Sequence, residues 1–390
     1  DFDHFEPYLQ KSFHRLPMLE NAGIRKFFSG PESFTPDTQY LLGETPEIKK
    51  LFTCCGFNSI GIASSGGAGR VTAEWMINGH INEDLFSLDI KRFQKFHSSK
   101  KFIMERVTET LGDLYGMHWP FKQHKTSRNQ IILPYQEELK KLGACFGTSG
   151  GFERPMWYAL KGEKADYKYS FGYQNWYPSA EYETKNTREN VGLFELSPFS
   201  KFDLEGQNVH EELQKICTAN IKDIEGRATY TQMLNEDGGI ETDVTITCLK
   251  KNHFRVIGPA ATREHDKFHI KKHISEEVNF KDVTEDLTCL GLYGPKSRKL
   301  LSNISNDDFT NEGIKFSHGK FVTIDGVKVW AQRLSYVGEV GFELYANIDE
   351  SKKLFLAIVK EGKNHGLSLC GAHAMDIMRM ESGFLHWGHD

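Results

Sequence analysis

Hydrophobic and polar residues alternate along residues 236–246, EDGGIETDVTI, as they do in a strand that follows a tight turn. Residues 237–239 supply the turn, and every second residue from Ile240 to Ile246 falls on one face. Asp243 then lies on the opposite face, although aspartate is a poor strand former. Two interpretations are open, because this face either meets water, as in many antiparallel sheets, or lines a site that uses the carboxylate.

Strand-like and helix-like segments alternate through the rest of residues 156–390. The predicted strands are 201–206, 253–258 and 288–294, and the predicted helices are 208–217, 262–274 and 295–301. This succession predicts an α+β fold whose strands pair mostly antiparallel.

Residues 51–79 follow another pattern. The apolar run 51–55 predicts a buried strand, and a glycine-rich turn leads into a helix from about Gly67 to Asn78, with Gly79 as its stop. Such a turn lets backbone N–H groups approach an anionic or electron-rich ligand. The turn lacks GxGxxG spacing, so it is not an ADP-binding fingerprint. A ligand-contacting turn and a simple tight connection both remain open.

The middle of the chain, residues 84–150, is charged and helical in pattern. Glycines at 147–151 and Pro155 mark a boundary. We therefore predict three parts, residues 1–96, 97–155 and 156–390.

Composition narrows the classes of function. The 390 residues suffice for two or three domains, and a net charge of −5 gives no polyanion-binding character. The lysine pairs at 140–141, 250–251 and 271–272 are short and interrupted by acids, so we interpret them as solvated faces and expect no nucleic-acid partner. The chain contains no apolar run of about 18 residues, so we expect no membrane span.

Cysteine and histidine spacing predicts neither a disulfide framework nor a metal site. The seven cysteines form no CxxC pair, which indicates reduced thiols. The sequence contains no HExxH, and the pairs His265/His269 and His386/His389 are interpreted as surface pairs.

Three stretches, in order along the chain, resemble the dimethylglycine/sarcosine dehydrogenase family. They are FSGPESFTPD at 28–37, GFNSIGIASSGGAGRVTAEWMINGH at 56–80, and a 156–390 domain containing GGIETDVTI and SYVGEVGFELY. Family members fuse an FAD-dependent amine oxidoreductase domain to a folate-binding domain similar to the aminomethyltransferase of the glycine cleavage system. The resemblance implies that 1–96 is the C-terminal part of the flavin domain, 97–155 a mainly helical linking domain, and 156–390 the folate-binding domain.

The resemblance also implies that the chain is an internal piece of a longer protein, inactive alone. Family members begin with a strand–GxGxxG–helix unit that holds the FAD pyrophosphate, and they end in a further β-rich domain. Neither unit has a counterpart in these 390 residues.

The family implies a two-stage reaction. An N-methyl group of dimethylglycine or sarcosine loses a hydride to FAD, and tetrahydrofolate takes up the one-carbon unit. The electrons then pass to oxygen or to an electron-transfer protein. The expected location is the cytoplasm in a bacterium and the mitochondrial matrix in a eukaryote. The resemblance leaves open which amine is oxidised and whether FAD is covalently bound.

Asp243 is the catalytic residue that the resemblance implies, beside the folate nitrogens that accept the carbon, where a carboxylate can take up a proton. Tyr336 and Glu343 stand seven residues apart, as the family's folate-contacting pair does. A carboxylate suits the adjacent N–H donors of a pterin's aminopyrimidine edge. The alternatives are a surface acid for Glu343 and a core aromatic for Tyr336.

Two further folate contacts are expected. Tyr345 lies on the same strand face as Glu343. Arg379 either meets the folate glutamate tail or forms a salt bridge with Asp376 or Glu381 on its own helix.

The resemblance places the FAD contacts in the turn after the first strand. The implied residues are Gly56, Phe57, Asn58, Ser59, Ile60, Gly61 and Ile62, with a glycine turn at 66–69 and Pro36-Asp37 as a neighbouring wall. Backbone N–H groups and a helix N-terminus would face the pyrimidine oxygen of the flavin ring. We expect this turn to open onto an apolar cleft.

The regulatory subunit of pyruvate dehydrogenase phosphatase also resembles the first hundred residues, and this non-catalytic function is the alternative. Glu343 favours the enzyme, because a regulator need not keep it. A stand-alone aminomethyltransferase is disfavoured, because it has no flavin portion.

Overall fold

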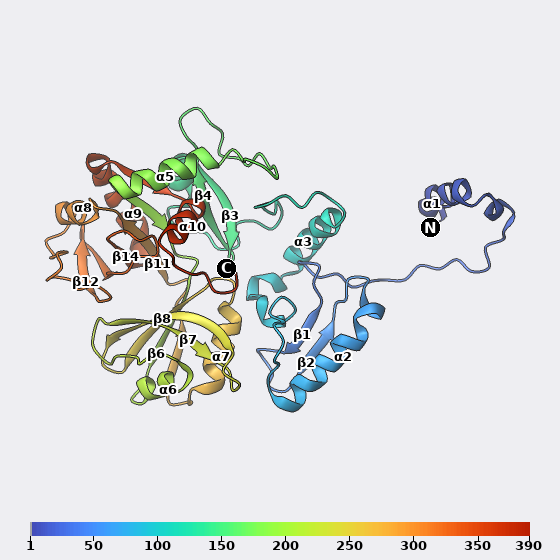
Figure 1. Cartoon of the computed structure of the whole chain (residues 1–390), viewed down its shortest axis with the longest axis horizontal. Helices are drawn as coiled ribbons and strands as arrows, with labels where there is room; N and C mark the ends of the chain where they lie inside the picture. Colours follow the sequence, from blue (N-terminus) through green and yellow to red (C-terminus); the bar gives the residue numbers. More distant parts are fainter. Residues whose placement is uncertain (1) are drawn as a thin grey trace.

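The first hundred residues form an arm and a small strand–helix unit. The computed structural model describes residues 2–390, and Figure 1 shows α1 (Phe2–Arg15) standing away from the remainder on an extended connection. Strands β1 (Leu41–Glu44) and β2 (Phe52–Cys55) pair antiparallel, and α2 (Gly61–Asn78) packs beside them through Ala68 and Val71.

Helix α2 ends as predicted but begins earlier. Gly79 adopts a left-handed conformation with φ 78° and donates its N–H to the Trp75 carbonyl, which closes the helix. Residues 66–69, predicted as a turn, are helical, because glycine is disfavoured in a helix but not excluded from it. The predicted strand at 51–55 is present as β2, but it is not buried. Both of its cysteines are exposed, since a two-stranded sheet leaves one face uncovered.

Helices α3 (Lys100–Asp113) and α4 (Gln136–Lys141) follow, and then a hairpin of β3 (Ala144–Ser149) and β4 (Phe152–Tyr158). Gly150 and Gly151 have positive φ and form the turn of this hairpin, while Pro155 lies within β4 beside a bulge. The residues predicted to mark a domain boundary therefore shape one hairpin, and a division at 155 would cut through β4.

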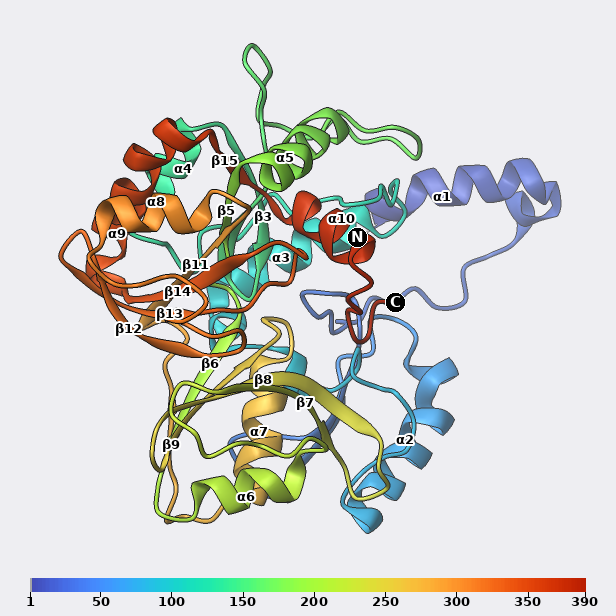
Figure 2. The same cartoon turned by 60° about the vertical axis from the view of Figure 1, so that its left-hand side comes forward.

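Two sheets make up most of the remaining chain, and they lie one above the other in Figures 1 and 2. The five-stranded sheet has the order β10-β6-β9-β8-β7, with bounds β6 Ser200–Glu205, β7 Ala228–Leu234, β8 Ile240–Lys250, β9 His253–Gly258 and β10 Asn279–Asp282. The six-stranded sheet has the order β12-β13-β14-β11-β5-β15, with bounds β5 Val191–Glu195, β11 Leu287–Tyr293, β12 Gly319–Ile324, β13 Val327–Gln332, β14 Gly341–Asn347 and β15 Leu367–Cys370. All neighbouring strands in these two sheets are antiparallel except β5 and β15, so the predicted α+β class is confirmed.

Each large sheet is covered by helices on one face. Helices α6 (Val209–Ile216) and α7 (Arg263–His273) bury one face of the five-stranded sheet, where Val244 and Ile246 lie. Helices α8 (Ser297–Ile304) and α9 (Ile348–Gly362) cover the outer face of the six-stranded sheet. Helices α5 (Tyr177–Glu189) and α10 (Ala372–Glu381) pack together beside β4 and β15. The other faces of the two sheets contact one another.

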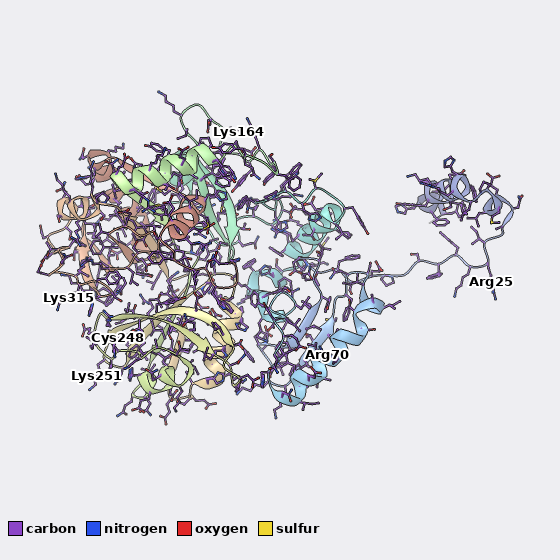
Figure 3. The ribbon with its side chains drawn as sticks, viewed as in Figure 1. Arg25, Arg70, Lys164, Cys248, Lys251 and Lys315 are labelled. Atoms are coloured by element: carbon purple, nitrogen blue, oxygen red, sulfur yellow. The ribbon has the colours of Figure 1, made fainter. Side chains whose placement is uncertain are left out.

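The lysine pairs lie on solvated faces, as predicted. All six of these lysines are exposed, and Figure 3 shows Lys251 at the periphery of the five-stranded sheet. Within residues 2–390, no helix combines the length and the apolar character that a membrane crossing requires.

Candidate functional site

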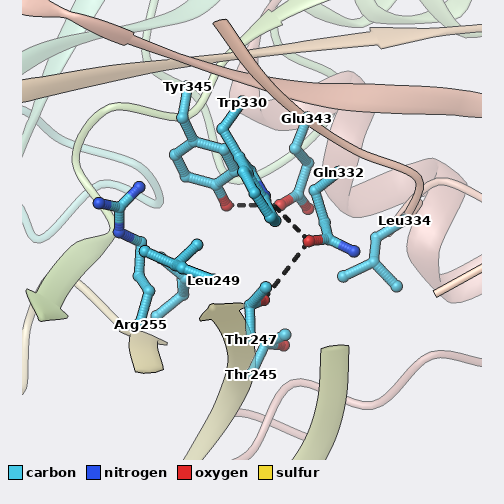
Figure 4. Close-up of a pocket in the computed structure, with 10 residues that line it drawn as sticks. Thr245, Thr247, Leu249, Arg255, Trp330, Gln332, Leu334, Glu343 and Tyr345 are labelled. Carbon is cyan, nitrogen blue, oxygen red and sulfur yellow. Dashed lines mark hydrogen bonds between the residues drawn. The ribbon is translucent and has the colours of Figure 1, made fainter. Parts of the chain in front are cut away.

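A small cavity lies between the facing sheets (Figure 4). Its lining includes Thr245 and Thr247 from β8, Arg255 from β9, Trp330 and Gln332 from β13, and Glu343 and Tyr345 from β14. Its volume is about 10 Å³, room for about one water. A ring-sized ligand therefore requires side chains at this interface to move.

Glu343 is half-buried between the sheets, at the cavity and not on the open surface. It lies on β14 between β13 and β11, directly opposite Gln332 and Gly291. The Tyr345 hydroxyl donates to the Glu343 carboxylate at 2.6 Å. Burial raises the pKa of Glu343, because the charged form loses hydration, and the bond from Tyr345 acts in the opposite direction.

Polar groups without partners surround this carboxylate. The Oε1 of Gln332 accepts from Trp330 Nε1 at 3.1 Å and from Thr247 Oγ1 at 3.5 Å, but its Nε2 has no hydrogen-bond partner. The buried Tyr293 hydroxyl is also unpartnered, and the charge of Glu343 adds to the effect of burial in raising the pKa of this phenol. Each buried, unsatisfied group costs about 1–3 kcal/mol. A polar ligand would satisfy them, so these residues fit an aminopyrimidine ring.

Asp243 faces the same gap from the opposite sheet. It shares one face of β8 with Thr245 and Thr247, while Thr242 and Val244 are buried on the other face. The Tyr230 hydroxyl donates to Asp243 Oδ2 at 2.8 Å. Burial raises the pKa of Tyr230 to about 12, and the Asp243 carboxylate adds to the shift. Asp243 therefore lies beyond Thr245 along the strand, not in the cavity lining.

Tyr336 lies near Asp243 but outside the cavity lining. Its hydroxyl donates to the Leu385 carbonyl at 3.2 Å, and its ring stacks on Phe384 with 6.2 Å between centroids. Burial raises the pKa of Tyr336, and the charge of Asp243 acts in the same direction. In this conformation Tyr336 is a half-buried aromatic residue with a satisfied hydroxyl.

Arg379 is occupied by acids close to it in the sequence. Its Nε donates to Asp376 at 2.8 Å and its Nη1 to Asp390 at 2.5 Å. Glu381, the other expected partner, pairs with Arg188 instead. The cavity therefore brings together Glu343 and Tyr345, while Arg379 is engaged elsewhere.

The predicted flavin-contacting turn is open. Gly56, Asn58 and Ser59 all have positive φ, and the Asn58 side chain fixes the turn by donating to the Gly56 carbonyl at 2.6 Å. Phe57 stacks on Tyr40, whereas Ile62 is 98% exposed.

The start of α2 offers backbone donors beside this turn. Ile60 precedes the helix and supplies no side-chain cap, so N–H groups of the first turn stay available. Further along α2, Met76 and Ile77 are also exposed. Asp37, in the expected neighbouring wall, is held by Arg92 at 2.6 Å. These residues fit contact with one edge of a flavin ring.

The two regions touch at the hairpin that carries Asp243. His80 lies 2.5 Å from Asp237 at the hairpin tip, and Phe86 packs edge-on against His265. His265 in turn pairs with Glu241 at 3.0 Å.

Several residues of this site were missed from the sequence. Thr245 and Thr247 share the two-residue period of Asp243, so the alternation alone could have identified them. Gln332 and Tyr293 reach Glu343 through strand pairing, for which the sequence carries no comparable signal.

Comparison with known proteins places the chain in a family. Residues 135–390 match the GCVT N-terminal domain, and residues 78–131 match the FAD dependent oxidoreductase central domain. The whole chain is 40% identical to 4-methylaminobutanoate oxidase (formaldehyde-forming) of Paenarthrobacter nicotinovorans, of which it covers 48%. It is also 32% identical to sarcosine dehydrogenase, mitochondrial, and 32% identical to pyruvate dehydrogenase phosphatase regulatory subunit, mitochondrial, both of Mus musculus, covering 47% and 45% of them.

A solved structure agrees with this fold. The glycine cleavage system aminomethyltransferase T from Bartonella henselae matches with a TM-score of 0.55 and 24% identity, over 66% of this chain and 64% of that one. The chain spans about half the length of the curated relatives that it matches. The protein belongs to the GCVT N-terminal domain family, with the central domain of the FAD dependent oxidoreductases preceding that domain in the chain.

Proposed function

We propose that the protein containing this chain is an FAD-dependent oxidase or dehydrogenase of N-methylated amino acids that passes the methyl carbon to tetrahydrofolate. The observation that carries the proposal is the half-buried Glu343 carboxylate between two sheets, beside the unpartnered Gln332 amide nitrogen and Tyr293 hydroxyl. Dimethylglycine and sarcosine are candidate substrates. The 40% identity to a 4-methylaminobutanoate oxidase adds longer N-methylamino acids to them.

FAD, when bound, supplies the acceptor for the hydride of the N-methyl group. The residues that would contact it are those of the turn at 56–62, where backbone N–H groups at the start of α2 can stabilise negative charge. The side chain of Asn58 keeps this turn in shape.

On the folate side, Glu343 accepts the N–H donors of the pterin edge, and Tyr345 holds the carboxylate in place. Asp243 takes the proton that a folate nitrogen loses as its bond to the incoming carbon forms. Tyr230 orients Asp243 through its hydroxyl. Tyr336, at the mouth of the gap, would contact the folate once the residues at 384–385 move aside. Arg379 would reach the glutamate tail only after leaving Asp376 or Asp390.

The test uses the complete protein with sarcosine, dimethylglycine or 4-methylaminobutanoate. Anaerobic bleaching of the flavin absorbance should identify the amine, and added tetrahydrofolate should convert the product from formaldehyde to methylenetetrahydrofolate. The proposal fails if no amine reduces the flavin and no folate binds.

The second candidate is a non-catalytic regulatory subunit, favoured by the 32% identity to the phosphatase regulatory subunit. In that case the same assay should show neither bleaching nor transfer, and the protein should instead change the activity of a phosphatase. The electron acceptor is either oxygen or an electron-transfer protein. Rates of reoxidation of the reduced flavin, measured with each of the two, identify it. The expected location is the mitochondrial matrix in a eukaryote, as the names of the mouse relatives state for those proteins, and the cytoplasm in a bacterium.

A further inference from the structure

Gln332 carries an unused hydrogen-bond donor beside the carboxylate of Glu343. The two residues are directly opposite each other on β13 and β14, so their side chains extend from the same face of the sheet. Gln332 is only 2% exposed, yet its Nε2 has no partner. Figure 4 shows this nitrogen directed toward Leu334, another residue of the cavity lining, and away from Trp330 and Thr247.

The orientation of the Gln332 amide is determined by its neighbours. Trp330 Nε1 is donor only and reaches Oε1 at 3.1 Å, so rotating the amide by half a turn would set two N–H groups against each other. Gly319 on β12 leaves room for this arrangement, because a Cβ there would lie 2.6 Å from Gln332 Oε1. These contacts therefore hold the donor on the side of Leu334, a residue of the cavity lining.

Glu343 retains the complementary capacity. The Tyr345 hydroxyl donates to one oxygen of this carboxylate. A carboxylate has about four lone-pair sites. The cavity therefore offers an acceptor beside a donor, aimed at one edge of a ligand.

We propose that Gln332 makes this site specific for a 2-amino-4-oxopyrimidine edge and discriminates against 4-amino analogues; this rests on the folate site of the proposed function. Glu343 accepts the amino and ring N–H groups, and Gln332 donates to the 4-oxo group. A 4-amino group presents N–H bonds to the Gln332 N–H, so the buried donor stays unpaired. Sites that leave a buried polar group unpaired reject the wrong ligand strongly.

The experiment measures dissociation constants of tetrahydrofolate and its 4-amino counterpart for the complete protein by fluorescence titration. Gln332→Met removes the donor while keeping an unbranched side chain of similar length. We expect the wild-type preference for the 4-oxo ligand to fall by about tenfold in this variant, the effect of one buried donor losing its partner. Gln207→Leu, at an exposed glutamine of the same domain, is the control and should keep the wild-type preference.

If Gln332→Met does not fold, a second variant tests the same role of Gln332. Gln332→Glu keeps an acceptor for Trp330 and replaces the donor by another acceptor, so the preference should move toward the 4-amino ligand. An unchanged preference in the folded variants would overturn the role of Gln332 while leaving the folate site intact. If neither ligand binds the wild-type protein, the proposed function itself fails, and the role of Gln332 fails with it.

Discussion

The two candidate sites of this protein differ in how far the chain's own residues enclose them. The cavity around Glu343 is closed by two sheets and has room for about one water. The turn at 56–62 opens outward, and Ile62 at the start of α2 is 98% exposed. Packing between sheets can align polar groups within a closed site, whereas a single turn beside two strands can only present a surface.

The two sites also differ in how their polar groups are satisfied. Around Glu343 two buried groups, the Gln332 amide nitrogen and the Tyr293 hydroxyl, lack partners, which indicates a ligand that supplies hydrogen bonds. At the turn, the side-chain bonds of Asn58 are satisfied and the exposed residues are largely apolar. The first site therefore depends on hydrogen bonding and the second on shape and backbone dipoles. The hairpin at 234–240, reached by His80, is one of the elements where the two regions meet.

The largest expected effect tests whether the two sites act separately. Asp243→Ala should lower transfer of the carbon to tetrahydrofolate by about 10²–10⁴-fold, the usual effect of losing a positioned proton acceptor. Flavin reduction by the amine should persist, and free formaldehyde should rise. Rapid-mixing absorbance and product analysis measure both stages. Slower flavin reduction in this variant would show that the sites are not separate.

Asp237→Ala is the matched control for that variant. It lies on the same hairpin and removes a carboxylate, but one that contacts His80 at the protein surface. Carbon transfer should continue near the wild-type rate. If transfer drops as it does in Asp243→Ala, the hairpin position and not the Asp243 carboxylate is responsible.

Glu343→Gln should weaken folate binding by about 1.5–3 kcal/mol, the range for a hydrogen bond to a charged group. Because burial raises the pKa of Glu343, its charged form is lost more readily on acidification. Wild-type affinity should therefore fall toward acidic pH, while the variant should show a flatter profile. Titrations at several pH values measure this, with the exposed Glu312→Gln as control. Equal affinities would mean that Glu343 does not contact the ligand.

The ion pairs of His265 with Glu241 and Asp266, next to the contact between the two regions, should make stability depend on pH. Burial acts to lower the pKa of His265, but pairing with Asp266 and Glu241 outweighs it and raises this pKa to about 9. Burial acts to raise the pKa of Glu241, but the bond from His265 outweighs it and lowers this pKa to about 2. The histidine contribution is fully present below pH 6.5 and disappears as the pH rises through 9. The glutamate contribution is present above pH 4.5 and is lost as the pH falls through 2.

We expect about 1–2 kcal/mol of stability to be lost between pH 6.5 and 9.5 on account of this pair, after allowing for its coupling. Urea unfolding of wild type and His265→Gln at both pH values measures the difference. The variant should lose less stability than the wild type over this interval. An identical loss in both proteins would assign the pH dependence to other groups.

The smallest effect is expected at the open turn. Ile62→Ser should change the stability of the 390-residue chain by no more than about 0.5 kcal/mol, because the side chain is almost fully exposed. Ile246→Ala, in the closed core at 0% exposure, should cost about 2–5 kcal/mol. Thermal unfolding compares the two. A large loss from Ile62→Ser would mean that this surface packs within the chain after all.

Local patterns in the sequence predicted the segments around Asp243 and Gly79 correctly. The alternation in 240–246 placed Thr242, Val244 and Ile246 on the buried face and Asp243 on the other, because a strand turns its side chains over every two residues. Gly79 ended α2 as predicted, because a left-handed residue closes a helix without distant partners. The glycines at 150–151 form a hairpin turn, and the same residue type also serves in linkers, so their pattern alone does not locate a domain boundary.

Only the tertiary structure decided how these elements form a site. The pairing of Gln332 with Glu343 depends on the register of β13 and β14, and the wall opposite them comes from β8, nearly ninety residues earlier in the chain. The salt bridge of Arg379 to Asp390 and the stacking of Phe384 on Tyr336 likewise depend on how the last residues fold back. Periodicity is a property of each segment's own backbone, whereas the choice of partner depends on the packing energy of segments that are distant in sequence.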